Sequence, residues 1–324
     1  MEIKPNEAPS FFLSIPIWIR GIYSFSFKNF ANFFQVIVLF IFPVSIALGF
    51  SIWFAFEDVI VNWNPDLFKI SFSEYNYSIF VFLVAASALL GIVSLLILSG
   101  TVIRTYNRLQ QTDDDPKEYQ SDFKEYFSGL PSLFLGSVIN FGLFYLIFFA
   151  PGQLLNLNLN ESVIIFIGLA QIVLFFAGSW LLISLVFWPV KVLESKSFGL
   201  KQFSDSIRLV NSYFFKVLGR LIILVILCYF TFGAASSIGE IIISILDLDK
   251  NSIELGSFSE KWSAPIQYWI GDTPAVSSLR MFFTFFGFSI ATIFWTTGIM
   301  LLYKALSENN EIKYQDGLDL SKLS

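Results

Sequence analysis

Histidine is absent from this chain, and cysteine occurs once, at position 228. Without histidine, the sequence lacks the commonest general base of enzymes and a very common ligand of protein-bound metals. A single cysteine forms no disulfide within the chain and no cysteine cluster around a metal. We therefore expect no enzyme activity, no catalytic residue, no metal site and no cofactor. Because Cys228 lies in an apolar run, we expect it to be a buried structural thiol.

Charge is also scarce. Charged residues make up 14% of the 324 residues, against about 25% in an ordinary soluble domain. Hydrophobic residues make up 55%, and the mean hydropathy is +0.69. So much apolar side chain does not fit inside a water-soluble globule, and lipid must solvate part of it. The sequence pI near 4.9 also disfavours a nucleic-acid partner.

Six apolar runs approach or exceed the length of about 20 residues that a helix needs to cross a bilayer. They contain no Asp, Glu, Lys or Arg, and they cover residues 33–54, 78–103, 130–154, 163–190, 221–239 and 281–303. We expect Pro43 to kink the first helix, and the long fourth helix to tilt or to project from the membrane. The predicted organisation is an N-terminal interfacial segment (1–32), a six-helix transmembrane domain (33–306) and a C-terminal tail (307–324).

The basic residues predict the orientation. Of the 20 Lys and Arg residues, 16 lie in the terminal segments and in the loops between runs two and three and between runs four and five. The remaining loops, which would lie on the opposite side of the membrane, hold four: Lys69, Lys250, Lys261 and Arg280. Because cytoplasmic loops are enriched in Lys and Arg, both termini are expected in the cytoplasm. Trp18 and Trp188 are then expected near the inner membrane interface.

Amphipathic patterns precede the odd-numbered runs. Before the fifth run, apolar residues recur every three or four positions opposite a polar face, which is typical of an interfacial helix that leads into the span. The apolar set is Leu200, Phe203, Ile207, Val210 and Phe214, and the polar set is Lys201, Asp205, Arg208 and Asn211. Similar patterns begin near Ile15 and near Asp115. The sequence therefore predicts an all-α polytopic membrane protein of three hairpins, each preceded by an amphipathic cytoplasmic helix; three unrelated interfacial helices are the alternative.

A few polar residues within or next to the runs are the candidate functional positions. Gln35, Asn140 and Gln171 lie inside runs, where hydrogen bonds between helices are the more common role and substrate binding the rarer one. Glu240 follows the fifth run directly, and we expect it to be solvated at the outer surface. No run contains a carboxylate near the membrane centre, which disfavours a proton-coupled transporter.

The end of the fourth run carries a family resemblance. Residues 189–194 read Pro-Val-Lys-Val-Leu-Glu, and an amphipathic helix with a serine follows at 199–208. This pattern resembles the YciC-like bacterial membrane proteins and the membrane domain attached to some glycerophosphodiester phosphodiesterases. The resemblance implies a six-helix fold in a bacterial inner membrane. It implies no activity, because the chemistry of the fused enzymes belongs to a separate soluble barrel. Glu194 and Ser206 are the matching positions; we expect them to organise the elbow, with Glu194 pairing with a nearby Lys or Arg.

Two functional hypotheses remain. The first is a non-enzymatic accessory or scaffold subunit of a larger membrane complex in the cell envelope, with membrane lipids and other membrane proteins as partners. The alternative is a transporter or lipid-handling protein with a cavity between the hairpins. The absence of histidine and the avoidance of charge in the runs disfavour an intramembrane enzyme.

Overall fold

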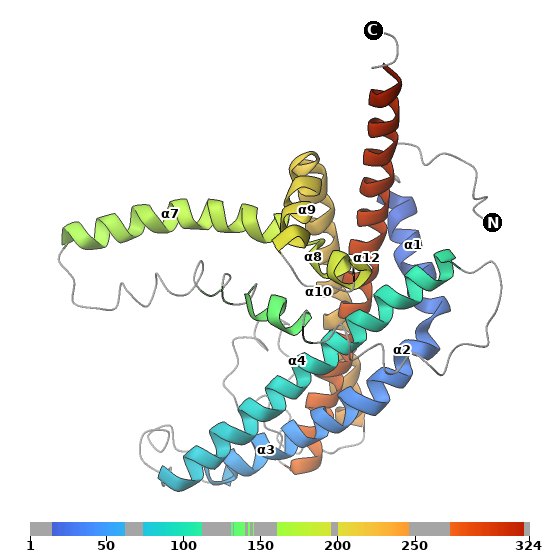
Figure 1. The fold of residues 1–324 in the computed structure, drawn as a ribbon. Coiled ribbons are helices and arrows are strands. Elements are labelled where there is room, and N and C mark those ends of the chain that lie inside the picture. Colours follow the sequence, from blue (N-terminus) through green and yellow to red (C-terminus); the bar gives the residue numbers. More distant parts are fainter. Residues whose placement is uncertain are drawn as a thin grey trace. The chain divides into compact units, whose positions relative to one another are not determined.

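The structure is a computed structural model of the whole chain (Figure 1). It describes residues 15–61, 74–111, 131, 133–139, 142, 145, 161–195, 200–245 and 273–320. Within these ranges every regular element is a helix and none is a strand. The predicted all-α fold class is therefore confirmed for the described part of the chain.

The helices are long and follow the apolar runs. In chain order they are α1 (Ile15–Lys28), α2 (Phe30–Val36), η1 (Ile37–Ile41), α3 (Phe42–Val61), α4 (Glu74–Gln111), α7 (Glu161–Ser184), α8 (Trp188–Ser195), α9 (Leu200–Asn211), α10 (Phe214–Ile245) and α12 (Pro274–Leu320).

Five stretches of these helices are long and apolar enough to cross a membrane. They are Phe30–Trp53, Ala85–Asn107, Gly168–Leu193, Phe214–Ile245 and Pro274–Ser307. They overlap five of the six predicted runs, so the chain has the character of a multi-pass membrane protein. The remaining run, 130–154, lies largely outside the described residues. The arrangement of six helices as three hairpins therefore stays a prediction, as do the amphipathic segment near Asp115 and the domain boundaries.

The chain forms two compact units, each made of segments distant in sequence. Unit 1 comprises Met1–Phe25, Gly100–Ile223 and Thr296–Ser324, and unit 2 comprises Ser26–Ser99 and Leu224–Trp295. Helices α1, α4, α10 and α12 therefore each contribute residues to both units.

Tryptophans form part of the core of unit 1. Trp18 is buried, and its indole N–H donates to the carbonyl of Gly298 at 3.2 Å. Trp188 is also buried, and its ring stacks on Phe203 with centroids 5.0 Å apart. Both side chains are enclosed by protein. They therefore have a packing role, and their expected depth near the inner membrane interface stays a prediction.

Helix α9 has two different faces in unit 1. Its buried side chains are Gln202, Ser206, Leu209 and Val210, and its exposed side chains are Lys201, Ser204, Arg208 and Asn211. The helix ends at Asn211, and a turn at Ser212 and Tyr213 separates it from α10. The sequence predicted that this helix leads straight into the next span, and the structure places a turn between them.

Prolines shape two other helices. Pro43 has no N–H for the carbonyl of Leu39, and directly before it the N–H of Phe42 donates to the carbonyl of Ile37 in a π-helical turn. The structure thus shows a π turn directly before Pro43, and the kink itself stays a prediction. Pro189 lies just after the turn 185–187, which separates α7 from α8. The fourth run is therefore two helices and not the single long helix that was predicted.

Phenylalanine contacts and close backbone approach hold the helices of unit 2 together. Phe42 packs edge-on against Phe282 with ring centroids 5.2 Å apart, and Phe232 packs against Phe288 at 4.5 Å. Gly49 of α3 faces the backbone of α12, where a Cβ atom would lie 2.5 Å from the Cα of Ser278. These contacts join α3 and α10 to the same helix, α12.

Candidate functional site

Glu240 lies in a buried ion pair of unit 2. Its Oε1 is 3.3 Å from the Nε of Arg280, and the side chains of Arg280 and Glu240 are 7% and 13% exposed. The expectation that Glu240 is solvated is therefore wrong. Glu240 lies near the carboxyl end of α10, and Arg280 near the amino end of α12. The ion pair therefore joins the carboxyl-terminal part of α10 to the amino-terminal part of α12, and each buried charge offsets the desolvation cost of the other.

The predicted amides do not gather into a site. Gln35 is exposed on α2, and Gln171 is partly exposed on α7. Within the described part of the chain, neither side chain forms a hydrogen bond. Asn140 lies outside the described residues. A bridging or binding role for these three residues stays a prediction.

Ser206 joins two helices of unit 1. Its hydroxyl is fully buried and donates to the carbonyl of Ser184 at 2.7 Å. Ser184 is the last residue of α7, where carbonyls lack partners within their own helix. The bond therefore satisfies a helix end and holds α9 against α7. Glu194 belongs to α8, but its side chain lies outside the described residues.

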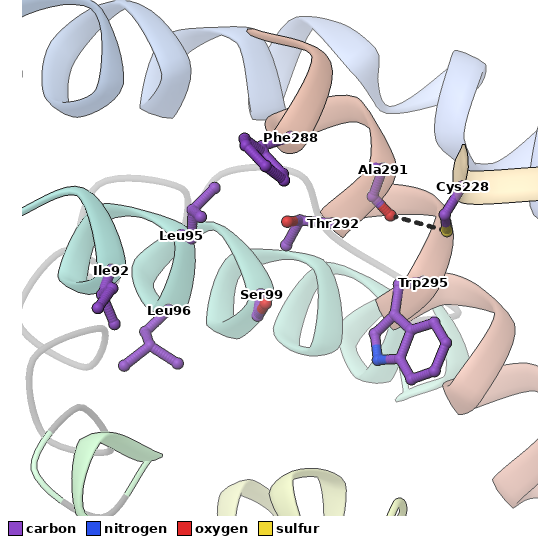
Figure 2. A pocket seen from close by; sticks show the side chains of 9 residues that line it. All are labelled: Ile92, Leu95, Leu96, Ser99, Cys228, Phe288, Ala291, Thr292 and Trp295. Carbon is purple, nitrogen blue, oxygen red and sulfur yellow. Dashed lines mark hydrogen bonds between the residues drawn. The ribbon is translucent and has the colours of Figure 1, made fainter. Parts of the chain in front are cut away.

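Unit 2 contains an apolar groove that the sequence did not reveal. Its volume is about 360 Å³, and it lies among α4, α10 and α12 (Figure 2). The lining residues of this unit 2 groove are Ile92, Leu95, Leu96, Ser99, Cys228, Phe288, Ala291, Thr292 and Trp295. The thiol of Cys228 donates to the carbonyl of Ala291 at 3.3 Å, which Figure 2 shows as a dashed line. The expected buried thiol is thus half-buried in the groove wall and hydrogen-bonded.

The unit 2 groove lies at the middle of the candidate spans. Cys228 is close to the midpoint of Phe214–Ile245. Phe288 and Trp295 flank the midpoint of Pro274–Ser307. At the centre of a bilayer the surroundings are hydrocarbon, so the groove suits an apolar chain. Its volume falls in the lower part of the usual range for small-molecule sites, about 300–1,000 Å³.

The groove has little capacity for chemistry. Its polar groups are two hydroxyls, one indole N–H and a thiol that is already hydrogen-bonded. Among the described residues, no group of three or more His, Cys, Asp or Glu could hold a metal ion. The groove can therefore hold a ligand by shape and apolar contact, with its two hydroxyls as the main hydrogen-bonding groups.

Helix α7 presents apolar side chains in every direction. The five successive residues Ile172, Val173, Leu174, Phe175 and Phe176 are between 44% and 69% exposed. Because 3.6 residues complete one turn, these five cover the full circumference of the helix. Only 17% of the most apolar window in the span Gly168–Leu193 is buried, against 56% in Pro274–Ser307. In Figure 1, α7 is the long yellow-green helix.

Comparison with known protein families, with curated proteins and with solved structures finds no match to this chain. The likeness to YciC-like proteins therefore stays a prediction from the quoted residues.

Proposed function

We propose that this chain is a non-enzymatic subunit of a larger membrane complex, in which it serves as an accessory or scaffold component of a bacterial inner membrane. The observation that carries this proposal is the exposure of α7 around its whole circumference. A helix that is apolar on all sides gains stability by burial in lipid or in protein. The occupant proposed here is a transmembrane helix of a partner subunit.

Two features favour a protein partner over lipid alone. A helix that packs against its own bundle turns one face inward, whereas within the described part of the chain all faces of α7 at residues 172–176 are exposed. Gly168 faces open space, because a Cβ atom there would have no neighbour within 4 Å. Small residues on transmembrane helices allow another backbone to pack closely, which stabilises helix pairs in lipid.

Site-specific photocrosslinking tests the proposal with a matched pair of positions. Phe176 of α7 and Phe230 of α10 are the same residue type, and each is 69% exposed. A benzophenone analogue of phenylalanine replaces one or the other in the full chain, in membranes of the native host. We expect position 176 to form one discrete adduct with another membrane protein and position 230 to react with lipid. Mass spectrometry of the adducts identifies the attached molecule.

Two results would contradict the subunit proposal. One is a set of adducts at position 176 that contains lipid and no protein. The other is the same protein attached at both positions, because the contact would then not belong to α7. Purification in mild detergent should also yield a complex of fixed stoichiometry, and a monomer that carries lipid would point to the second candidate.

The second candidate is a lipid-handling protein, and the unit 2 groove favours it. The groove is apolar, large enough for part of an acyl chain, and located at mid-depth in the candidate spans. A bound lipid that is lost when the groove is filled would be the mark of this function.

A further inference from the structure

Two lysines of unit 1 lie over tyrosine rings. The Nζ of Lys191 is 5.4 Å from the centroid of the Tyr303 ring, and the Nζ of Lys304 is 5.8 Å from that of Tyr106. Both tyrosines are largely buried and both lysines are half-buried. The four residues come from α4, α8 and α12, and we call them the lysine–tyrosine cluster.

Among the described residues, no carboxylate pairs with the positive charge of this cluster. Within the described part of the chain, neither Lys191 nor Lys304 forms an ion pair. The ring faces attract the ammonium groups and offset part of the cost of removing them from water. The aromatic rings contribute no net negative charge. The two lysines therefore favour the binding of an anion beside them.

The cluster lies at the ends of three candidate spans. Tyr106, Lys191 and Lys304 lie one, two and three residues before the ends of Ala85–Asn107, Gly168–Leu193 and Pro274–Ser307. A helix rises about 1.5 Å per residue, so all three are within about 5 Å of the span ends. Because Lys191 contacts Tyr303 and Lys304 contacts Tyr106, these three ends are on the same side of the membrane. A bilayer placed around these candidate spans puts the cluster at the depth of the lipid head groups.

We propose that the lysine–tyrosine cluster binds the phosphate of an anionic phospholipid. Lys191 and Lys304 supply the positive charge, and the rings of Tyr106 and Tyr303 hold the ammonium groups in place. The choice of a lipid over a soluble phosphate rests on the depth of the cluster at the span ends. Basic pockets between transmembrane helices suit anionic head groups for the same reason. This inference is independent of whether α7 binds a partner.

Native mass spectrometry of the purified, delipidated chain tests the proposal. Phosphatidylglycerol and phosphatidylcholine of equal chain length are added in turn, and the bound fraction is measured. We expect the wild-type chain to prefer phosphatidylglycerol. The double variant Lys191→Gln/Lys304→Gln should bind it about thirtyfold more weakly, which is the combined effect expected of two lysines at a membrane surface.

The matched control removes the same number of charges elsewhere in unit 1. Arg20 and Lys201 are exposed, and the variant Arg20→Gln/Lys201→Gln should bind phosphatidylglycerol as the wild type does. The variant Lys191→Arg/Lys304→Arg keeps both charges and should retain binding. If the Gln pair elutes as an aggregate, the single variants Lys191→Gln and Lys304→Gln are compared instead.

Several outcomes would overturn the proposal. They are a wild-type chain without preference for the anionic lipid, an equal loss in the control variant, and retained binding in the Gln variants. Inorganic phosphate is a further arm of the experiment. If millimolar phosphate displaces the lipid, the site recognises soluble phosphate, and the lipid assignment is wrong.

Discussion

A single missing methyl group sets the distance between α3 and α12 in unit 2. At Gly49, a Cβ atom would lie 2.5 Å from the Cα of Ser278 and 2.8 Å from its backbone nitrogen. Backbone atoms cannot rotate away as the end of a side chain can, so any larger residue must push the two helices apart. The sequence shows a glycine here, but the atoms that make it necessary are more than two hundred positions away.

We predict that Gly49→Ala destabilises the chain by about 1–3 kcal/mol through overpacking. In a helix, replacement of glycine by alanine normally stabilises by up to about 1 kcal/mol, so a loss would have the opposite sign to the intrinsic preference. The control is Gly168→Ala, where the new methyl group meets nothing within 4 Å. Thermal denaturation of both variants in detergent provides the comparison. Equal stability of the two would contradict the close approach of α3 and α12.

The surroundings of the single residue Glu240 were wrongly predicted from the sequence. It follows directly on an apolar run, and a carboxylate at the end of a span usually meets water. Its partner Arg280 is 40 positions away and directly precedes another run. An ion pair across two helices leaves no periodic signal in either one, so the sequence predicted solvent where the structure has a buried contact.

At the scale of elements, the periodicity of apolar residues predicted helix α9, but it did not predict the contacts of α9 with α7 and α8. The three-and-four spacing of apolar residues indicated a helix at 200–214, and Ser206 was predicted as part of the elbow. The bond from Ser206 to Ser184 and the stack of Trp188 on Phe203 join positions that no local pattern relates. The break before Pro189 was missed because hydropathy continues through it, although proline is a known signal for a helix boundary.

The unit 2 groove supports a prediction at the scale of the three helices that line it. Leu95→Trp should fill the groove, because Leu95 lines it, whereas Leu90→Trp on the same helix points a tryptophan into an exposed position. We expect native mass spectrometry to show a co-purified lipid on the wild type and on Leu90→Trp, and a clear loss on Leu95→Trp. Equal lipid content in all three proteins would remove the groove as a lipid site.

At the scale of the whole molecule, composition predicted the multi-pass membrane character, and the five candidate spans agree with it. The sixth crossing stays a prediction, because the run 130–154 falls largely outside the described residues. The distribution of 16 basic residues against four therefore carries the prediction of orientation.

Single cysteines test this orientation. In a Cys228→Ser background, Lys201→Cys lies between the fourth and fifth predicted spans and Ala275→Cys lies at the start of α12; both positions are exposed. In intact cells, we expect a membrane-impermeant maleimide to label position 275 directly and position 201 only after permeabilisation. Labelling of both positions from the same side would contradict the predicted topology.

The π turn before Pro43 has a consequence for insertions and deletions. Phe33, Ile37, Ile41, Ser45 and Gly49 are all buried, at intervals of four residues. In a regular α-helix, positions four apart drift by about 40° per step, so Gly49 would be turned well away from the side of Phe33. The wide turn absorbs part of that drift by accommodating one extra residue. Deletion of one residue between Ile37 and Ile41 would restore an ordinary helical ladder there, and would rotate Gly49 out of line with Ser278.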